Sequence, residues 1–182
     1  MDYINHLELY MPKETLDRIK ECDDIYLKAA TLVRILFRDK KDKVGEPYLG
    51  HLLRVSNKMT TVDGMVAGLL HEVVEDISNI EFADLLDIGI PDNIIEVLKL
   101  VTNEPTSNKL TQEEKLHRYN EKIDKIIASG NDLALELKIF DMSDNYNPTR
   151  LEKLPLEKLI WFNEKYAKNL SKLKKEKRKR EC

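Results

Sequence analysis

One stretch of the chain constrains its fold more than any other. Residues 65–70 (Met-Val-Ala-Gly-Leu-Leu) carry no charge, and they lead directly into the segment 71–76, His-Glu-Val-Val-Glu-Asp. Charged residues make up 35% of this chain, so an uncharged helical run of this kind is expected to be buried. Ionisable groups beside a buried run cost free energy unless they are paired or bind a metal. The fold must therefore place this segment centrally and give its ionisable end partners.

The rest of the chain shows the apolar spacing that is typical of helices. Six glycines and six prolines among 182 residues disfavour a strand-and-turn architecture. The pattern predicts helices over residues 13–20, 22–38, 49–59, 64–76, 80–87, 92–101, 111–129, 132–146 and from 156 onwards. Asp63 is expected to cap the fourth of these helices, and Thr111 with Glu114 has the spacing of a capping box. We therefore expect a compact all-α fold with no substantial sheet.

Length and charge predict one domain with a basic tail. A chain of 182 residues suits a single domain, expected over residues 1–171. Residues 172–181 contain seven Lys or Arg and two Glu, whereas the whole chain has a net charge of −3. The remaining body is therefore acidic, which disfavours nucleic-acid binding by the folded part. The tail, residues 172–182, is expected either to be a solvated helix end or to contact RNA or another anionic surface.

The sequence indicates a cytoplasmic protein. It contains no apolar run of the length that crosses a bilayer, and the first 20 residues lack a basic-then-apolar signal pattern. Cys22 and Cys182 are the only cysteines, so neither a disulfide framework nor a zinc finger is expected. The pattern does not define an oligomeric state.

The ionisable end of the central segment has the composition of a metal site. On a helix, His71 neighbours Glu75, and Glu72 neighbours Asp76. Carboxylates that are brought together repel one another, and a divalent cation relieves that repulsion. Histidine with carboxylate oxygen is a ligand set for manganese, iron or zinc. The alternative is an amphipathic helix whose last turn is simply solvated.

Two further segments place ligand-type residues on apolar surfaces. His51 lies within the apolar segment 49–55, and Asp141 directly follows Ile139-Phe140. Asn145 lies on the same helix face as Asp141. Taken singly, such residues are more often satisfied structural groups. Their occurrence together with the segment 71–76 favours one shared polar site.

The three segments together resemble the HD superfamily, and within it the hydrolase domain of RelA/SpoT homologues. That family has Gly-x-Pro-Tyr-x-x-His, then Leu-Leu-His-Asp-x-x-Glu-Asp, then Val-Lys-x-x-Asp-x-x-x-Asn. This chain has Gly-Glu-Pro-Tyr-Leu-Gly-His at 45–51, Leu-Leu-His-Glu-Val-Val-Glu-Asp at 69–76, and Leu-Lys-Ile-Phe-Asp-Met-Ser-Asp-Asn at 137–145. The resemblance extends from about residue 29 to residue 151. Any one motif would be weak, but three in the same order are specific.

The resemblance implies a site and an activity. It implies one divalent metal ion, usually Mn²⁺, with Fe, Zn and Mg as alternatives, and the ligands would be His51, His71, Glu72 and Asp141. It implies that Glu75 and Asp76 are catalytic, orienting or activating the attacking water. Asn145 would contact the nucleotide, and Tyr48 is expected to bind the substrate with it. Lys41 and Lys43, which flank Asp42, are the expected substitutes for a basic substrate-binding residue of the family. The family reaction removes the 3′-pyrophosphate from guanosine tetra- or pentaphosphate, so the expected partner is a phosphorylated small molecule.

Three departures from the family pattern leave a second interpretation open. Glu72 occupies an Asp position, and Asp42 aligns with a basic residue. Asn-Glu-Pro at 103–105 replaces a segment in which the family has a Lys, and Lys109 is the nearest substitute. The alternative is a degenerate HD domain that binds a nucleotide or a partner without turnover. The segment 118–123, Arg-Tyr-x-x-Lys-Ile, is more similar to small stand-alone HD phosphohydrolases. A zinc peptidase is disfavoured because Glu75 stands where His-Glu-x-x-His requires its second His.

Overall fold

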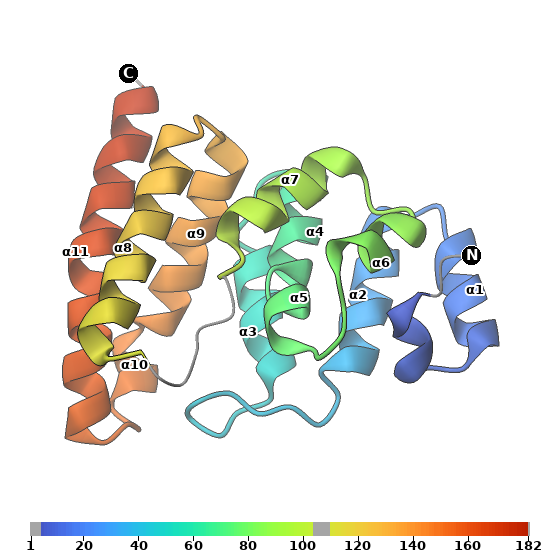
Figure 1. The fold of residues 1–182 in the computed structure, drawn as a ribbon, viewed down its shortest axis with the longest axis horizontal. Coiled ribbons are helices and arrows are strands. Elements are labelled where there is room, and N and C mark those ends of the chain that lie inside the picture. The colour runs from blue at the N-terminus through green and yellow to red at the C-terminus, as the bar shows by residue number, and fades with distance from the viewer. Residues whose placement is uncertain (1–4, 104–109, 182) are drawn as a thin grey trace.

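The computed structural model describes residues 5–103 and 110–181, and these residues are arranged as a succession of helices (Figure 1). The elements are η1 (His6–Leu9), α1 (Lys13–Glu21), α2 (Ile25–Leu36), α3 (Tyr48–Ser56), α4 (Val62–Leu70), α5 (Val73–Asp76), α6 (Phe82–Asp87), α7 (Asp92–Val101), α8 (Gln112–Ala128), α9 (Asp132–Asn145), α10 (Pro148–Leu151) and α11 (Leu156–Arg180). Within the described residues, β-type pairing is limited to an isolated antiparallel bridge between Lys41 and Pro47. The expected all-α fold is confirmed.

Helix α4 lies at the centre of the fold. It packs against α2, α3, α7 and α9, while α8, α9 and α11 stand side by side at the C-terminal end (Figure 1). Five consecutive residues of α4, Val66 to Leu70, are buried, as the uncharged run predicts. Gly68 permits the closest approach, because a Cβ atom there would lie 2.7 Å from the Cα of Ser56 in α3. The packing of α4 against α3 therefore sets the positions of His51, which lies in α3, and of His71, which directly follows α4.

The helix predicted over residues 64–76 is instead two helices. It starts at Val62, because Thr61 rather than Asp63 is the N-cap and accepts a hydrogen bond from the backbone N of Gly64 (3.1 Å). It ends at Leu70, and α5 begins at Val73. Glu72 lies in the intervening turn with φ −104° and ψ −2°. His71 and Glu72 therefore occupy a helix break. By contrast, the helix over 92–101 and the capping box that opens α8 match the expectation.

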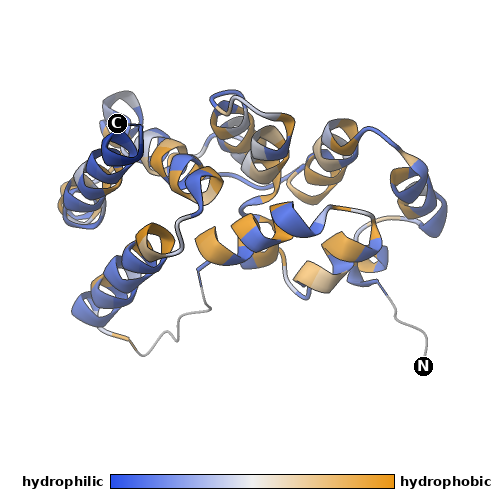
Figure 2. Ribbon diagram, turned by 90° about the horizontal axis from the view of Figure 1, so that it is seen from above, coloured by the Kyte–Doolittle hydropathy of each residue, from blue (hydrophilic) through white to orange (hydrophobic). Residues whose placement is uncertain are grey.

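Hydrophobic residues face the inside of the helical assembly, and the last turns of α11 are strongly hydrophilic (Figure 2). The basic segment nevertheless continues α11 through Arg180, and Leu173 within it is fully buried. Lys177 pairs with Glu136 of α9 at 2.6 Å. The predicted boundary between body and tail thus falls inside one continuous helix. No helix among residues 5–103 and 110–181 is both long and apolar enough to cross a membrane.

Candidate metal centre and the adjoining pocket

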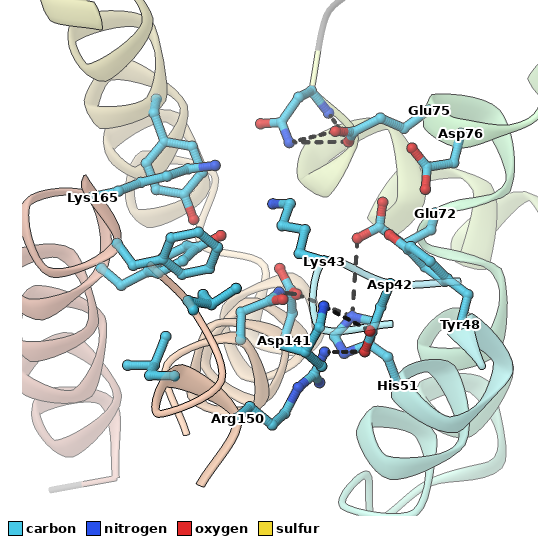
Figure 3. Close-up of a pocket in the computed structure, with 18 of the residues that line it drawn as sticks. Asp42, Lys43, Tyr48, His51, Glu72, Glu75, Asp76, Asp141, Arg150 and Lys165 are labelled. Carbon is cyan, nitrogen blue, oxygen red and sulfur yellow. Dashed lines mark hydrogen bonds and ion pairs between the residues drawn. The ribbon is translucent and has the colours of Figure 1, made fainter. Parts of the chain in front are cut away.

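Two buried histidines meet where α3 and the end of α4 come together, and Figure 3 shows the first of them, His51, among the residues of the adjoining pocket. His51 belongs to α3, and His71 directly follows α4. Their exposed fractions are 2% and 4%, and their ring centroids are 5.3 Å apart. Both side chains lie within the core, so each ring nitrogen needs a partner.

Each histidine has one nitrogen held by the protein and one without a hydrogen-bond partner. Nδ1 of His51 donates to Oδ2 of Asp144 (2.7 Å), and Nδ1 of His71 donates to the carbonyl oxygen of Gly68 (2.8 Å). The Nε2 atoms of both rings are buried and make no hydrogen bond within the described part of the chain. Metal-binding histidines have this arrangement: a hydrogen bond from one ring nitrogen to an acceptor orients the ring, and the other nitrogen coordinates the metal. The two Nε2 atoms are therefore prepared for a cation.

Two carboxylates complete the cluster. His51, His71, Glu72 and Asp141 each offer one atom, and these atoms lie within 4.8 Å of one another. Nε2 of His71 is 3.5 Å from Oε1 of Glu72, and Nε2 of His51 is 3.5 Å from Oδ1 of Asp141. Two nitrogens and two carboxylate oxygens form a ligand set that suits manganese, iron or zinc. The residues present therefore fit a divalent cation, and the four ligands expected from sequence are brought together.

The two ligand carboxylates have opposite electrostatic surroundings. Burial favours the neutral form of Asp141, but the ammonium of Lys138 at 2.8 Å and the two histidines outweigh it and hold the pKa of Asp141 well below its usual range. Asn145 also donates to Oδ1 of Asp141 (2.6 Å). Burial raises the pKa of Glu72, and Glu75, Asp141 and Asp76 add to this effect, with His71 opposing it. A cation between these groups would stabilise the ionised form of Glu72.

Asp144 anchors His51 through a larger ionic network. Its carboxylate accepts hydrogen bonds from Nε of Arg54 (2.7 Å) and from Arg150 of α10. Arg150 also donates to Oδ2 of Asp42 (2.6 Å), so the aspartate in the loop before α3 is paired with an arginine from α10. Burial lowers the pKa of His51, but the carboxylates of Asp141 and Asp144 outweigh it and raise this pKa to about 9, so a cation that binds at Nε2 would displace a proton from this nitrogen. The network fixes the orientation of the His51 ring.

The two carboxylates predicted to be catalytic lie on α5 beside the cluster (Figure 3). Glu75 accepts hydrogen bonds from the backbone N (2.9 Å) and from Nδ2 (3.0 Å) of Asn103. Asp76 pairs with Lys40 at 3.0 Å. Both carboxylates line the same pocket as His51 and Asp141. They are therefore held in place but remain open to a bound molecule.

The pocket has a volume of about 180 Å³ and contains most of the residues predicted to contact a substrate. Lys43, Tyr48 and Asn145 line it. Lys41 does not line it; this residue is exposed and its backbone forms the bridge to Pro47. Lys109, the suggested substitute for a family lysine, lies outside the described residues.

Sequence reasoning did not single out several residues of the site. Asp144 lies in the third motif, directly before Asn145, so its position in that motif could have identified it. No sequence motif pointed to Arg150. Lys165 of α11 faces Glu75 and Asp76 from the opposite wall (Figure 3). Burial, together with Lys43 and Lys138, lowers the pKa of Lys165 to about 8. Only the packing of α11 against α8 and α9 reveals that this lysine belongs to the site.

Comparison with known proteins supports the fold. No family model matches the chain, and no curated protein matches it in sequence. Among solved structures it is similar to a metazoan ortholog of SpoT, a protein that hydrolyses ppGpp and plays a role in starvation responses. The TM-score is 0.62 at 21% identity, over 87% of this chain and 97% of that chain. The chain therefore shares the all-helical fold of that protein.

Proposed function

We propose that this chain is a metal-dependent phosphohydrolase that acts on a nucleotide pyrophosphate. The carrying observation is the pair of buried Nε2 atoms of His51 and His71, which find no hydrogen-bond partner among the residues that the structure describes and converge with Glu72 and Asp141. Two oriented imidazoles and two carboxylates around a point next to an open pocket are the parts of a hydrolytic metal site. The fold shared with a ppGpp hydrolase supports the same reaction class.

The proposed cofactor is one divalent ion, with Mn²⁺ as our choice, held by the four clustered residues. When bound there, it supplies a water that is activated at neutral pH and offsets negative charge on the phosphoryl group. Lys138 keeps Asp141 ionised, and Asp144 fixes the ring of His51. These two residues are positioning residues, because each acts through a ligand.

The remaining steps use residues of the chain. Glu75, with Asp76 beside it on α5, accepts one proton of the attacking water as the water oxygen forms a bond to phosphorus. The bond from phosphorus to the leaving oxygen breaks, and that oxygen takes up the proton that the carboxylate had accepted. Lys43 and Asn145 line the pocket and are assigned to hold the substrate. We propose the 3′-pyrophosphate of guanosine tetra- or pentaphosphate as the group removed, which the similarity to the SpoT ortholog supports.

Phosphate and pyrophosphate release from a nucleotide panel tests this proposal. The panel contains guanosine tetraphosphate, and each reaction is run with Mn²⁺ and with chelator. We expect Mn²⁺-dependent release that is lost in Glu75→Gln and kept in Glu14→Gln, a matched change at an exposed residue of α1. No release on any nucleotide from protein that contains stoichiometric metal would contradict the proposed reaction.

A binding domain without turnover is the second candidate. It is favoured by Glu72, which occupies a position where the resembled family has Asp. It is also favoured by Asp42, which pairs with Arg150 and so neutralises a positive charge beside the pocket. The variant Glu72→Asp separates the two candidates. If the site is catalytic, this variant retains or gains turnover with Mn²⁺. If the variant binds nucleotide and metal yet releases no product, the binding function replaces the enzymatic one.

A further inference from the structure

A larger groove adjoins the metal pocket between α7, α8 and α11. Its volume is about 740 Å³. Six basic residues line it, whereas three acidic residues do: Lys99, Lys115, Arg118, Lys122, Lys125 and Lys165 against Glu75, Asp76 and Glu121. Of the three acids, Asp76 is already paired with Lys40. In a chain with a net charge of −3, this concentration of positive charge is local. Such a cleft attracts anions.

Four of the basic residues form a stripe along α8. Lys115, Arg118, Lys122 and Lys125 are spaced by three, four and three residues, so they lie on one face of the helix. At 1.5 Å per residue, the stripe is about 15 Å long. Arg118 and Lys125 form no ion pair with any described residue. Two cations of this row, Arg118 and Lys125, are thus available to an extended anionic group.

The groove is continuous with the metal pocket. Glu75, Asp76, Asn103, Tyr119 and Lys165 line both. The hydroxyl of Tyr119 is buried and has no hydrogen-bond partner within the described chain. The ammonium of Lys165 lies 4.3 Å from the centroid of the Tyr119 ring. A phosphoryl oxygen at this junction would accept a hydrogen bond from the hydroxyl and offset the charge of the lysine.

The volumes of the metal pocket and of the groove indicate that one bound molecule would occupy both. Sites for small molecules commonly occupy about 300–1,000 Å³, so the metal pocket alone, at about 180 Å³, holds only the reacting group. The rest of the molecule then extends into the groove. Its volume of about 740 Å³ corresponds to one compact ligand and not to a long nucleic-acid strand.

We infer that this groove is a second phosphate-binding subsite, whose α8 stripe binds a phosphate chain distal to the reacting phosphate. Arg118 and Lys125 are specificity-determining residues in this inference. Its place in catalysis rests on the proposed function, because that function puts the reacting phosphate at the metal. Anion binding by the groove itself does not need the metal and is tested without it.

Trp161 provides a direct reporter, because it lines the groove and is the only tryptophan of the chain. Metal-stripped full-length protein is titrated with inorganic tripolyphosphate while the fluorescence of Trp161 is followed. We expect saturable binding that weakens at least tenfold in the double variant Arg118→Glu/Lys125→Glu. The control Lys174→Glu/Lys175→Glu reverses two exposed charges on the basic end of α11, outside the groove, and is expected to change the Kd less than twofold. Circular dichroism verifies that both variants are folded.

Three results would overturn the inference. One is an unchanged Kd in Arg118→Glu/Lys125→Glu, and another is an equal loss in Lys174→Glu/Lys175→Glu, which would place the anion on the basic end of α11. The third is binding of a single-stranded oligonucleotide without binding of tripolyphosphate, which would assign the groove to nucleic acid. A groove that binds tripolyphosphate in a protein without Mn²⁺-dependent hydrolysis would leave the subsite intact and remove only the proposed function.

Discussion

Replacement of Gly68 by alanine tests whether the close contact between α3 and α4 builds the metal centre. A Cβ atom at this position would lie 2.7 Å from Cα and 2.9 Å from N of Ser56. Both contacts are with backbone atoms, so no side-chain rotation relieves them and the two helices must separate by several tenths of an ångström. Separation moves His51, which α3 carries, away from His71, which follows α4.

The expected magnitude follows from two opposing effects. Overpacking a core costs about 1–3 kcal/mol. Alanine in a helix interior regains about 1 kcal/mol over glycine. A backbone contact places Gly68→Ala at the upper end of the cost, so we expect a net loss of about 2 kcal/mol. For a chain of this size, that corresponds to a fall in Tm of about 4–8 °C. Metal affinity is expected to fall about tenfold or more, since ligand positions shift.

The matched control is Gly50→Ala in α3. A Cβ atom at Gly50 meets only Nη1 of Arg54, at 3.2 Å, and this atom is the end of a flexible side chain. We expect an unchanged Tm or a rise of up to about 4 °C, from the better helix propensity of alanine. Calorimetry of the two variants measures Tm, and titration calorimetry with Mn²⁺ measures affinity. A Tm of Gly68→Ala at or above that of the wild type, with unchanged Mn²⁺ affinity, would refute the reasoning.

Three other changes have defined outcomes. Asp144→Asn removes the charged acceptor at Nδ1 of His51, so metal affinity measured by titration calorimetry should fall about 10- to 100-fold; unchanged affinity would mean that the ring needs no such support. The pKa of Lys165 is lowered by burial and by Lys43 and Lys138 to about 8, so the unfolded chain binds this proton more tightly and stability falls as pH drops from about 10.5 towards 8. Urea unfolding should therefore show Lys165→Met more stable than the wild type by roughly 3 kcal/mol at pH 7, with a gain that shrinks towards pH 10, and a pH-independent difference would count against this cause. Thr111→Ala removes the N-cap of α8 and should cost about 1 kcal/mol in the same assay, whereas a loss near zero would show that the exposed capping box adds little.

The sequence was sufficient for the parts of the site that lie in contiguous motifs. The uncharged run before His71 required a buried central helix, and α4 is that helix. Periodicity could not reveal the break after Leu70, because His71 and Glu72 are compatible with a continuing helix and only tertiary packing turns the chain there. The same limit explains the error at the helix start, where Thr61 and Asp63 are both good caps.

Residues that reach the site from distant elements were beyond sequence reasoning. Arg150 pairs with both Asp42 and Asp144, and this pairing depends on how α10 packs beside the loop before α3. Lys165 lies on α11. The amphipathic pattern of this helix predicts which face is buried, but it does not predict which helices pack against that face. Lys41 and Lys43 are two residues apart in an irregular loop. Their spacing therefore could not show that Lys43 lines the pocket and Lys41 does not.

Metal content is the measurement that tests the central claim most directly. Protein is loaded with Mn²⁺, freed of unbound ion by gel filtration, and analysed by plasma mass spectrometry beside His71→Ala and the surface control His117→Ala. We predict about one ion per chain in the wild type and in His117→Ala, whose side chain is exposed, and none in His71→Ala. Stoichiometric metal in His71→Ala, or none in the wild type, would contradict a metal centre at His51, His71, Glu72 and Asp141.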